Sequence, residues 1–211
     1  AEFERPVLVV PAVSVRVTPQ GLLWPQARAD SRSISVVVRT EADGGSRGQI
    51  AVRAPAGWAV TPPSQSYDLP EAGAERTLTF DLRPPGNASP GEHVFGVVAR
   101  AEGGQEYTEG YTLIDYEHIE RAALFGPAEA RVTVVPVVVA EGLRVGYIMG
   151  SGDDGPDAIR QMGVEVELLD EDRVRQGDFD GFDAVVLGVR AYEARADLRA
   201  AAEQLLDFAR A

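Results

Sequence analysis

The chain has 211 residues, of which 45% are hydrophobic, and a formal net charge of −13. This hydrophobic fraction is typical of globular domains, and no apolar run approaches the ~20 residues of a membrane helix. The sequence has no basic stripe that would neutralise phosphates, which argues against binding to nucleic acid and to anionic membrane surfaces. It contains no cysteine, so disulfides, thiolate metal sites and cysteine nucleophiles are all excluded.

Short alternating segments fill the sequence up to about residue 140. In Val13–Val17 every second residue is a valine, and the same period of two recurs at 34–39, 49–53, 77–82, 93–99 and 131–135. Such alternation places one face of a strand in a core and the other in water. Clusters of Gly, Pro and Asp separate the segments. The pattern predicts an antiparallel immunoglobulin-like β-sandwich over residues 1–140, with residues 115–128 as a connector within it.

The pattern changes after Gly142. Segments 143–149, 164–169 and 182–189 are apolar and strand-like, and helical patterns separate and follow them. This order predicts a three-layer α/β segment with a parallel, Rossmann- or flavodoxin-like sheet over residues 141–211. We expect one long helix at 195–210, with a buried stripe of Leu198, Ala201, Ala202, Leu205, Leu206 and Phe208.

Three parallel strands make only part of such a sheet, and the third would leave an open edge. The sequence also begins at Ala1 and not at Met. We therefore expect the chain to be a stretch of a larger protein that includes an incomplete α/β domain.

Several segments resemble known families. The turn Pro55–Trp58 is similar to one in bacterial immunoglobulin-like modules that are appended to carbohydrate-active and cell-wall enzymes. A longer series resembles the C-terminal region of large secreted LmbE/PIG-L-type deacetylases, and it comprises Gly110–Ile119, Phe125–Glu129, Val145–Asp154 and Phe182–Tyr192. In that family a zinc-dependent N-acetyl-sugar deacetylase domain precedes a β-sandwich and a glutamine-amidotransferase-like α/β domain.

The resemblance implies no catalytic residue in this chain. The family's zinc site belongs to its N-terminal domain and uses a His-Pro-Asp-Asp motif, whereas His93 and His118, the two histidines here, have no such neighbours. The amidotransferase nucleophile is also missing, because the chain has no cysteine. We therefore predict a non-enzymatic chain without cofactor or metal.

One loop has the spacing G-x-G-x-x-G after a strand and before a helix, and Asp170 follows it at the end of the next strand. This spacing is typical of dinucleotide sites. Carboxylates in the loop would instead repel a pyrophosphate and cap the helix. A small-ligand site and a cation site that includes Asp157 are further alternatives. The candidate ligand-binding residues are Gly150, Gly152, Asp153 and Asp154.

Three further groups of residues are candidates for binding or for a structural role. Trp58, Tyr107 and Tyr111 are candidates for stacking on sugars, although strand aromatics more often belong to a core. Asp115, His118 and Arg121 suggest either a base or ligand site or, alternatively, a connector held by buried hydrogen bonds. The acidic group Glu165, Glu167, Asp170, Glu171 and Asp172 is interpreted as a solvated edge.

The leading functional prediction is an accessory region of a secreted bacterial N-acetyl-sugar deacetylase, which spaces, docks or binds carbohydrate. Its expected partners are cell-wall polysaccharide and the remainder of its own parent chain. The alternative is a structural protein that assembles into extracellular polymers by strand addition at open sheet edges. A nucleotide- or small-ligand-binding α/β enzyme fragment is the third hypothesis. Under each hypothesis we expect no binding to nucleic acid and no insertion into a membrane.

Overall fold

The computed structural model describes residues 8–116, 118 and 120–210. The chain divides into two compact units, Ala1–Leu22 with Arg28–Val135, and Leu23–Ala27 with Pro136–Ala211. The observed division and the predicted one at residue 140 fall in the same irregular connection before Arg144. No helix within the described residues is long and apolar enough to cross a bilayer.

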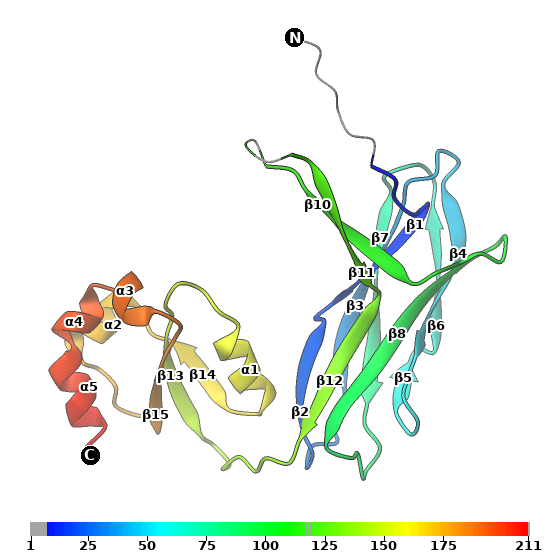
Figure 1. Cartoon of the computed structure of the whole chain (residues 1–211). Coiled ribbons are helices and arrows are strands. Elements are labelled where there is room, and N and C mark those ends of the chain that lie inside the picture. The colour runs from blue at the N-terminus through cyan, green and yellow to red at the C-terminus, as the bar shows by residue number, and fades with distance from the viewer. Residues whose placement is uncertain (1–7, 117, 119, 211) are drawn as a thin grey trace. The chain divides into compact units, whose positions relative to one another are not determined.

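The first unit is an antiparallel β-sandwich with a projecting hairpin (Figure 1). One sheet has the order β1-β3-β7-β5, and the other has the order β2-β12-β8-β4-β6 with β9 paired to β8. Strands β10 and β11 form the hairpin. The strands are β1 Val13–Thr18, β2 Gly21–Pro25, β3 Arg32–Thr40, β4 Ser46–Arg53, β5 Ala59–Thr61, β6 Ser64–Leu69, β7 Glu75–Arg83, β8 Gly91–Ala101, β9 Glu106–Tyr107, β10 Glu109–Ile114, β11 Ala122–Pro127 and β12 Glu129–Val135.

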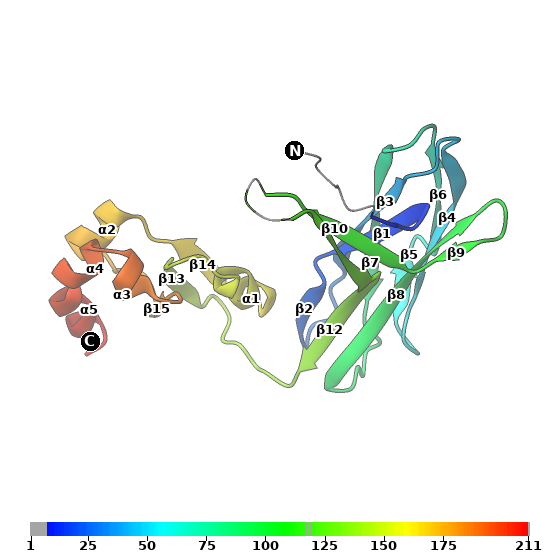
Figure 2. The same cartoon turned by 45° about the horizontal axis from the view of Figure 1, so that its top comes forward.

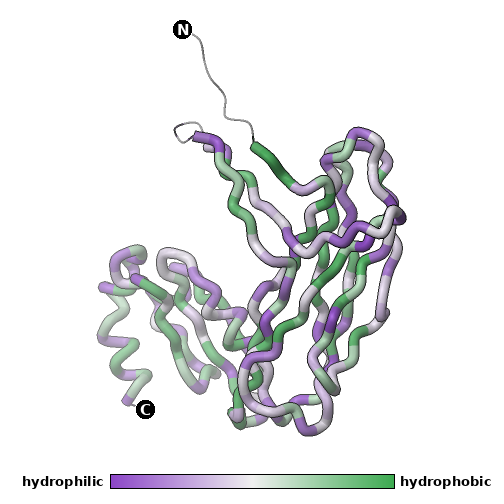
Figure 3. The backbone as a smooth tube through the Cα atoms, turned by 45° about the vertical axis from the view of Figure 1, so that its right-hand side comes forward, coloured by the Kyte–Doolittle hydropathy of each residue, from purple (hydrophilic) through white to green (hydrophobic). Residues whose placement is uncertain are grey.

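Alternation builds the sandwich core as the sequence predicts. In β3 the side chains of Ile34, Val36 and Val38 are fully buried, and their neighbours Ser35 and Val37 are only partly buried. Phe80 on β7 and Phe95 on β8 are also fully buried. The tube in Figure 3 shows the same alternation of hydrophobic and hydrophilic residues along these strands. The predicted β-sandwich is thus confirmed.

The predicted connector at 115–128 is wrong. Residues 122–127 form strand β11, which pairs antiparallel with β10, so that Tyr111 lies opposite Phe125. The hairpin leans away from the sandwich in both ribbon views (Figure 2). The strand escaped prediction because Ala122–Pro127 does not alternate in polarity and ends in Gly126-Pro127, which are turn residues by composition.

The second unit contains a three-stranded parallel sheet with the order β14-β13-β15. Its core cluster includes Ile148, Leu169, Val174, Phe182 and Leu198. The elements are β13 Arg144–Ile148, α1 Gly155–Gln161, β14 Glu165–Leu168, α2 Glu171–Gln176, β15 Ala184–Leu187, α3 Ala191–Ala194, α4 Asp197–Ala200 and α5 Ala202–Phe208.

The prediction of one long helix at 195–210 is also wrong. Arg195 is extended (φ −121°, ψ 105°), and Ala201 separates α4 from α5 with φ −91° and ψ 8°. Arg195 leaves the helical conformation where its guanidinium binds Asp197, with Nε and Nη2 donating at 2.9 and 2.6 Å. Most of the predicted buried stripe is nevertheless confirmed. Leu198 and Ala201 are buried, and Leu205 and Phe208 pack against the same core cluster. Leu206, in contrast, is 55% exposed.

Candidate functional site

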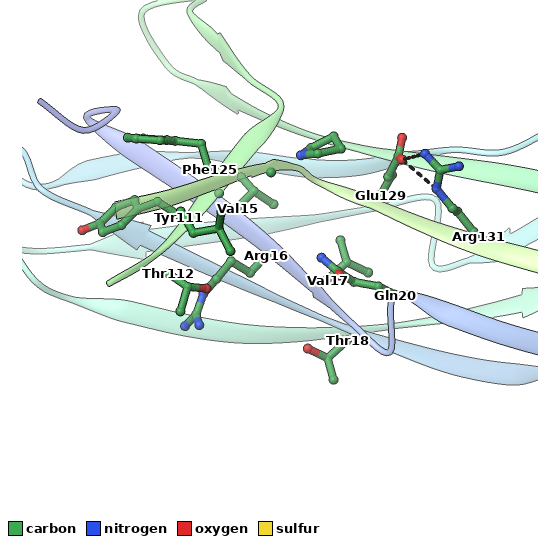
Figure 4. A pocket seen from close by; sticks show the side chains of 14 residues that line it. Val15, Arg16, Val17, Thr18, Gln20, Tyr111, Thr112, Phe125, Glu129 and Arg131 are labelled. Carbon is green, nitrogen blue, oxygen red and sulfur yellow. Dashed lines mark hydrogen bonds and ion pairs between the residues drawn. The ribbon is translucent and has the colours of Figure 1, made fainter. Parts of the chain in front are cut away.

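A groove of about 700 Å³ lies between strand β1 and the β10–β11 hairpin, within the first unit (Figure 4). Three chain segments line it, one from β1, one from β10 and one that runs from β11 into β12. The lining residues are Val15, Arg16, Val17, Thr18, Gln20, Gly110, Tyr111, Thr112, Leu124, Phe125, Gly126, Pro127, Glu129 and Arg131.

Main-chain atoms form much of the wall on the β1 side. Val15 to Thr18 line the groove consecutively, whereas a groove over one face of a strand would meet only alternate residues. Val15 and Val17 are 0% and 3% exposed because their side chains enter the core. Since β1 is an edge strand, alternate N–H and C=O groups have no strand partner on its outer side. The wall therefore offers hydrogen-bonding groups at regular intervals.

Two aromatic rings lie on the hairpin side. Tyr111 and Phe125 face each other across the strands, with ring centroids 6.1 Å apart and planes inclined by 44°. The Tyr111 hydroxyl donates to Glu41 Oε1 at 2.6 Å, and Arg39 Nε donates to the same oxygen at 2.6 Å. Tyr111 is thereby fixed, whereas Phe125 is 47% exposed and is free to contact a ligand.

The same contacts shift two pKa values in opposite directions. Burial, followed by the hydrogen bond to Glu41, raises the pKa of Tyr111. Hydrogen bonds from Arg39 and Tyr111 lower the pKa of Glu41. Both shifts favour a neutral phenol that donates to an ionised carboxylate, so the bond that fixes the ring persists across the neutral pH range.

A glycine permits the hairpin to approach β1. A Cβ atom on Gly110 would lie 3.0 Å from the carbonyl carbon of Val15, closer still to its oxygen, and 2.7 Å from Arg16 Cγ. Real Cβ atoms do not approach backbone this closely. Gly126, the cross-strand partner of Gly110, has open space at the same position. Gly110, and not Gly126, therefore lies where the hairpin approaches β1 closely.

The charged side chains of the groove differ in how they are paired. Arg131 Nη2 lies 2.6 Å from Glu129 Oε1, and its Nη1 lies 3.2 Å from Glu92 Oε1. Arg16 is exposed and forms no ion pair with any residue that the structure describes. The cation that is available to a ligand is therefore Arg16.

The G-x-G-x-x-G loop of the second unit is filled by its own carboxylate. Asp153 Oδ1 accepts from the Tyr147 hydroxyl at 2.6 Å and from Gly155 N at 2.9 Å, and Oδ2 accepts from Val189 N at 2.9 Å. These bonds join the ends of β13 and β15 to the start of α1. Burial, followed by the bond to Asp153, raises the pKa of Tyr147 to about 12.

The loop glycines serve this close packing. A Cβ on Gly150 would meet the Val189 carbonyl, and a Cβ on Gly188 would lie 2.8 Å from Asp153 Oδ2. No space for a pyrophosphate remains at the amides that Asp153 occupies, so the geometry does not support the dinucleotide reading. The predicted capping role needs one correction, because Asp154 is the N-cap residue by position but its side chain makes no capping bond.

The acidic candidates are largely paired. Asp170 caps α2 by accepting from Arg173 N at 2.9 Å, and Glu167 forms ion pairs with Arg144 and Arg173. Glu171 and Asp172 both bind Arg175. All five acidic residues are exposed, as expected of a solvated edge, and their ion pairs and capping bond lie at the surface. Among the described residues, no group of three or more side chains is arranged to hold a metal ion.

Trp58 belongs to the core. It is 8% exposed and meets Phe95 edge-on at 5.1 Å between ring centroids, so its faces are not available to a sugar. Tyr107 lies on β9, outside the groove, and only Tyr111 of the predicted stacking residues lines it.

The predicted buried network in the connector is wrong, because its members are exposed at the hairpin tip. Arg121 Nε lies 3.3 Å from Asp115 Oδ2, and the two side chains are 55% and 60% exposed. His118 is also exposed. An exposed pair of this kind contributes little to stability.

Part of the sandwich is similar to a known protein family. Residues 26–102 match the model described as the NPCBM-associated, NEW3 domain of alpha-galactosidase. This stretch is similar to a NEW3 domain. The NEW3-like region includes all of β3 to β8 but covers less than half of the chain. The groove combines it with β1, the hairpin and β12.

Solved structures are similar to the chain in outline only. WR4, an MSP family member of C. elegans, has a TM-score of 0.33 and 14% identity, covering 57% of this chain and 97% of its own. AggA, the major subunit of aggregative adherence fimbriae type I from Escherichia coli, has a TM-score of 0.34 and 13% identity, with coverages of 63% and 100%. A FixG-related protein from Vibrio parahaemolyticus has a TM-score of 0.38 and 11% identity, with coverages of 59% and 98%. None of the curated proteins matches the chain.

Most of the groove could not be predicted from the sequence. Phe125 lies in the segment that was predicted as a connector, and Arg16 is one polar position in an alternating strand. The one available signal was the spacing of aromatics around Gly110, a glycine within a strand, which marks a close approach of backbone.

Proposed function

We propose that this chain is a non-catalytic accessory region of a secreted bacterial carbohydrate-active enzyme, and that its sandwich binds glycan in the groove between β1 and the hairpin. The observation that carries the proposal is the match of residues 26–102 to a domain named for its association with alpha-galactosidase.

The chemistry of the groove supports a sugar ligand. Sugar rings have apolar faces that pack on aromatic rings, and their hydroxyls need closely placed donors and acceptors. Phe125 offers an exposed ring face beside Tyr111. Thr18, Gln20 and Thr112 supply polar side chains, and the edge of β1 supplies main-chain groups. The groove is open, so an internal stretch of a polysaccharide can enter it.

The finer parts of the proposal come from the sequence resemblance. We propose an N-acetyl-sugar deacetylase of the LmbE/PIG-L type as the parent enzyme and cell-wall polysaccharide as the target. In this view the second unit is the beginning of a glutamine-amidotransferase-like α/β domain without activity of its own. The three parallel strands of that unit are consistent with this assignment.

Affinity measurements on the intact chain test the proposal. Isothermal titration with soluble oligosaccharides of chitin, peptidoglycan, galactan and pectin should show binding to at least one of them. Phe125→Ala should weaken that binding up to about tenfold, the value of one aromatic contact. Tyr192→Ala is the matched control, because Tyr192 is 46% exposed in the other unit. Equal losses in both variants, or no binding in the panel, would reject the groove as a glycan site.

Assembly by strand addition is the second candidate, and the open edge of β1 favours it. An added strand would bind the same main-chain groups that line the groove. Light scattering over a concentration series tests this candidate. Growth of the particle mass with concentration would support it, and a monomer at every concentration would exclude it.

A further inference from the structure

We infer that the groove selects glycans that bear carboxylates, such as uronic acids, and that Arg16 is the residue that recognises them. This inference rests on the proposed glycan-binding function and specifies the ligand of the same groove. The charged residues that line the groove carry a net positive charge, whereas the chain as a whole has a net charge of −13.

The lining contains two cations, Arg16 and Arg131, and one anion, Glu129. Arg131 is bound to Glu129 and also to Glu92 just outside the groove, so its charge is compensated. The charge that remains is that of Arg16, in a chain of net charge −13. A local positive charge on an acidic protein favours an anionic group at that one position, because the surrounding carboxylates repel anions elsewhere.

Arg16 is also held where a ligand would pass. Its Cγ lies beside Gly110, at 2.7 Å from the place of a Cβ, so its stem lies under the hairpin where β10 crosses β1. Figure 4 shows Arg16 beside Thr112, on the other side of the β11–β12 ribbon from the Phe125 ring. A glycan that follows the edge of β1 past Thr112 can thus present a substituent toward Arg16. The planar guanidinium matches a carboxylate through paired hydrogen bonds.

The test compares oligogalacturonate and oligomannuronate with their methyl esters, which keep the sugar backbone and remove the charge. Titration of the intact chain should show the acid form binding about tenfold more tightly than its ester, the value of one charge-assisted hydrogen bond. The difference should shrink in high salt. Arg16→Gln should abolish the preference, and Arg16→Lys should keep part of it.

Arg76→Gln is the matched control, because Arg76 is an exposed arginine on β7 of the same sheet, outside the groove. Its acid preference should equal that of the unmodified chain. Equal binding of acid and ester, or binding only of neutral glycans, would overturn the inference and leave glycan binding intact. A preference that survives Arg16→Gln would also overturn it. No binding of any glycan, neutral or acidic, would reject the proposed function itself.

Discussion

Gly110 and Gly126 face each other in one hairpin, yet we expect opposite results from replacing them with alanine. Neither has a positive φ, so the backbone accepts alanine at both positions. A Cβ at 110 would meet the Val15 carbonyl and Arg16, whereas a Cβ at 126 would meet nothing within 4 Å. The comparison therefore isolates the contact between β10 and β1 from the general effect of adding a methyl group.

The magnitude follows from the contacts. In Gly110→Ala the Val15 carbonyl must move by on the order of 1 Å to restore van der Waals distance, and such overpacking costs about 1–3 kcal/mol. Loss of chain entropy in the unfolded state offsets about 0.4–1 kcal/mol of that cost. The net expectation is a loss of about 1–2 kcal/mol. Gly126→Ala keeps only the entropic gain and should be neutral or slightly stabilising.

Denaturant unfolding measures the difference. Trp58 is buried beside strand β5 of the sandwich, so its intrinsic fluorescence follows the unfolding of this unit. Glycan affinity should fall in Gly110→Ala and persist in Gly126→Ala, because only the former moves the groove wall. If the two variants had equal midpoints and equal affinities, the hairpin would not be held against β1 in the way described.

Three further predictions concern the rest of the molecule. Asp197→Ala should destabilise the second unit by about 3 kcal/mol, because it leaves the mostly buried Arg195 guanidinium uncompensated. The helical signal in circular dichroism reports this loss, since every described helix lies in that unit; an unchanged midpoint would refute it. The pKa of Tyr147 is raised from 10.0 to about 12 in the folded protein. The protonated phenol therefore stabilises that unit fully below pH 10, and this stabilisation should disappear as the pH rises from 10 to about 12. Tyr147→Phe should remove this pH dependence, and a variant that kept it would assign it to another group. Trp58→Ala should cost about 3 kcal/mol in sandwich stability with glycan affinity unchanged in the folded protein; lost affinity at unchanged stability would instead make Trp58 a binding residue.

The sequence predicted those elements whose burial follows a simple period. The β3 segment alternates because one of its faces meets the opposite sheet, and burial of Ile34 and Val36 follows directly from the pattern. The hairpin has no such opposite layer along its length, since Leu124 and Phe125 are both exposed although they are consecutive. Periodicity therefore carried no information about β11.

The candidate site was harder to predict because it depends on distant pairings. Arg16 and Phe125 are more than a hundred residues apart in the sequence, and no local pattern relates them. The extended Arg195 before α4 has a local origin instead, since its pairing with Asp197, two residues further on, overrides good helix propensity. Local preferences fixed the elements, and long-range contacts decided which of their surfaces face one another.

Asp153 can be regarded as an internal ligand. Two amides and one phenol converge on its carboxylate, which is the donor set that an anion-binding loop would present to a substrate. The loop thus resembles an anion-binding site whose anion is a side chain of the loop itself. Replacement of Asp153 by glycine would leave these three donors without their carboxylate partner. The motif G-x-G-x-x-G in this chain therefore specifies a backbone geometry, and the residue inside it determines whether that geometry is occupied.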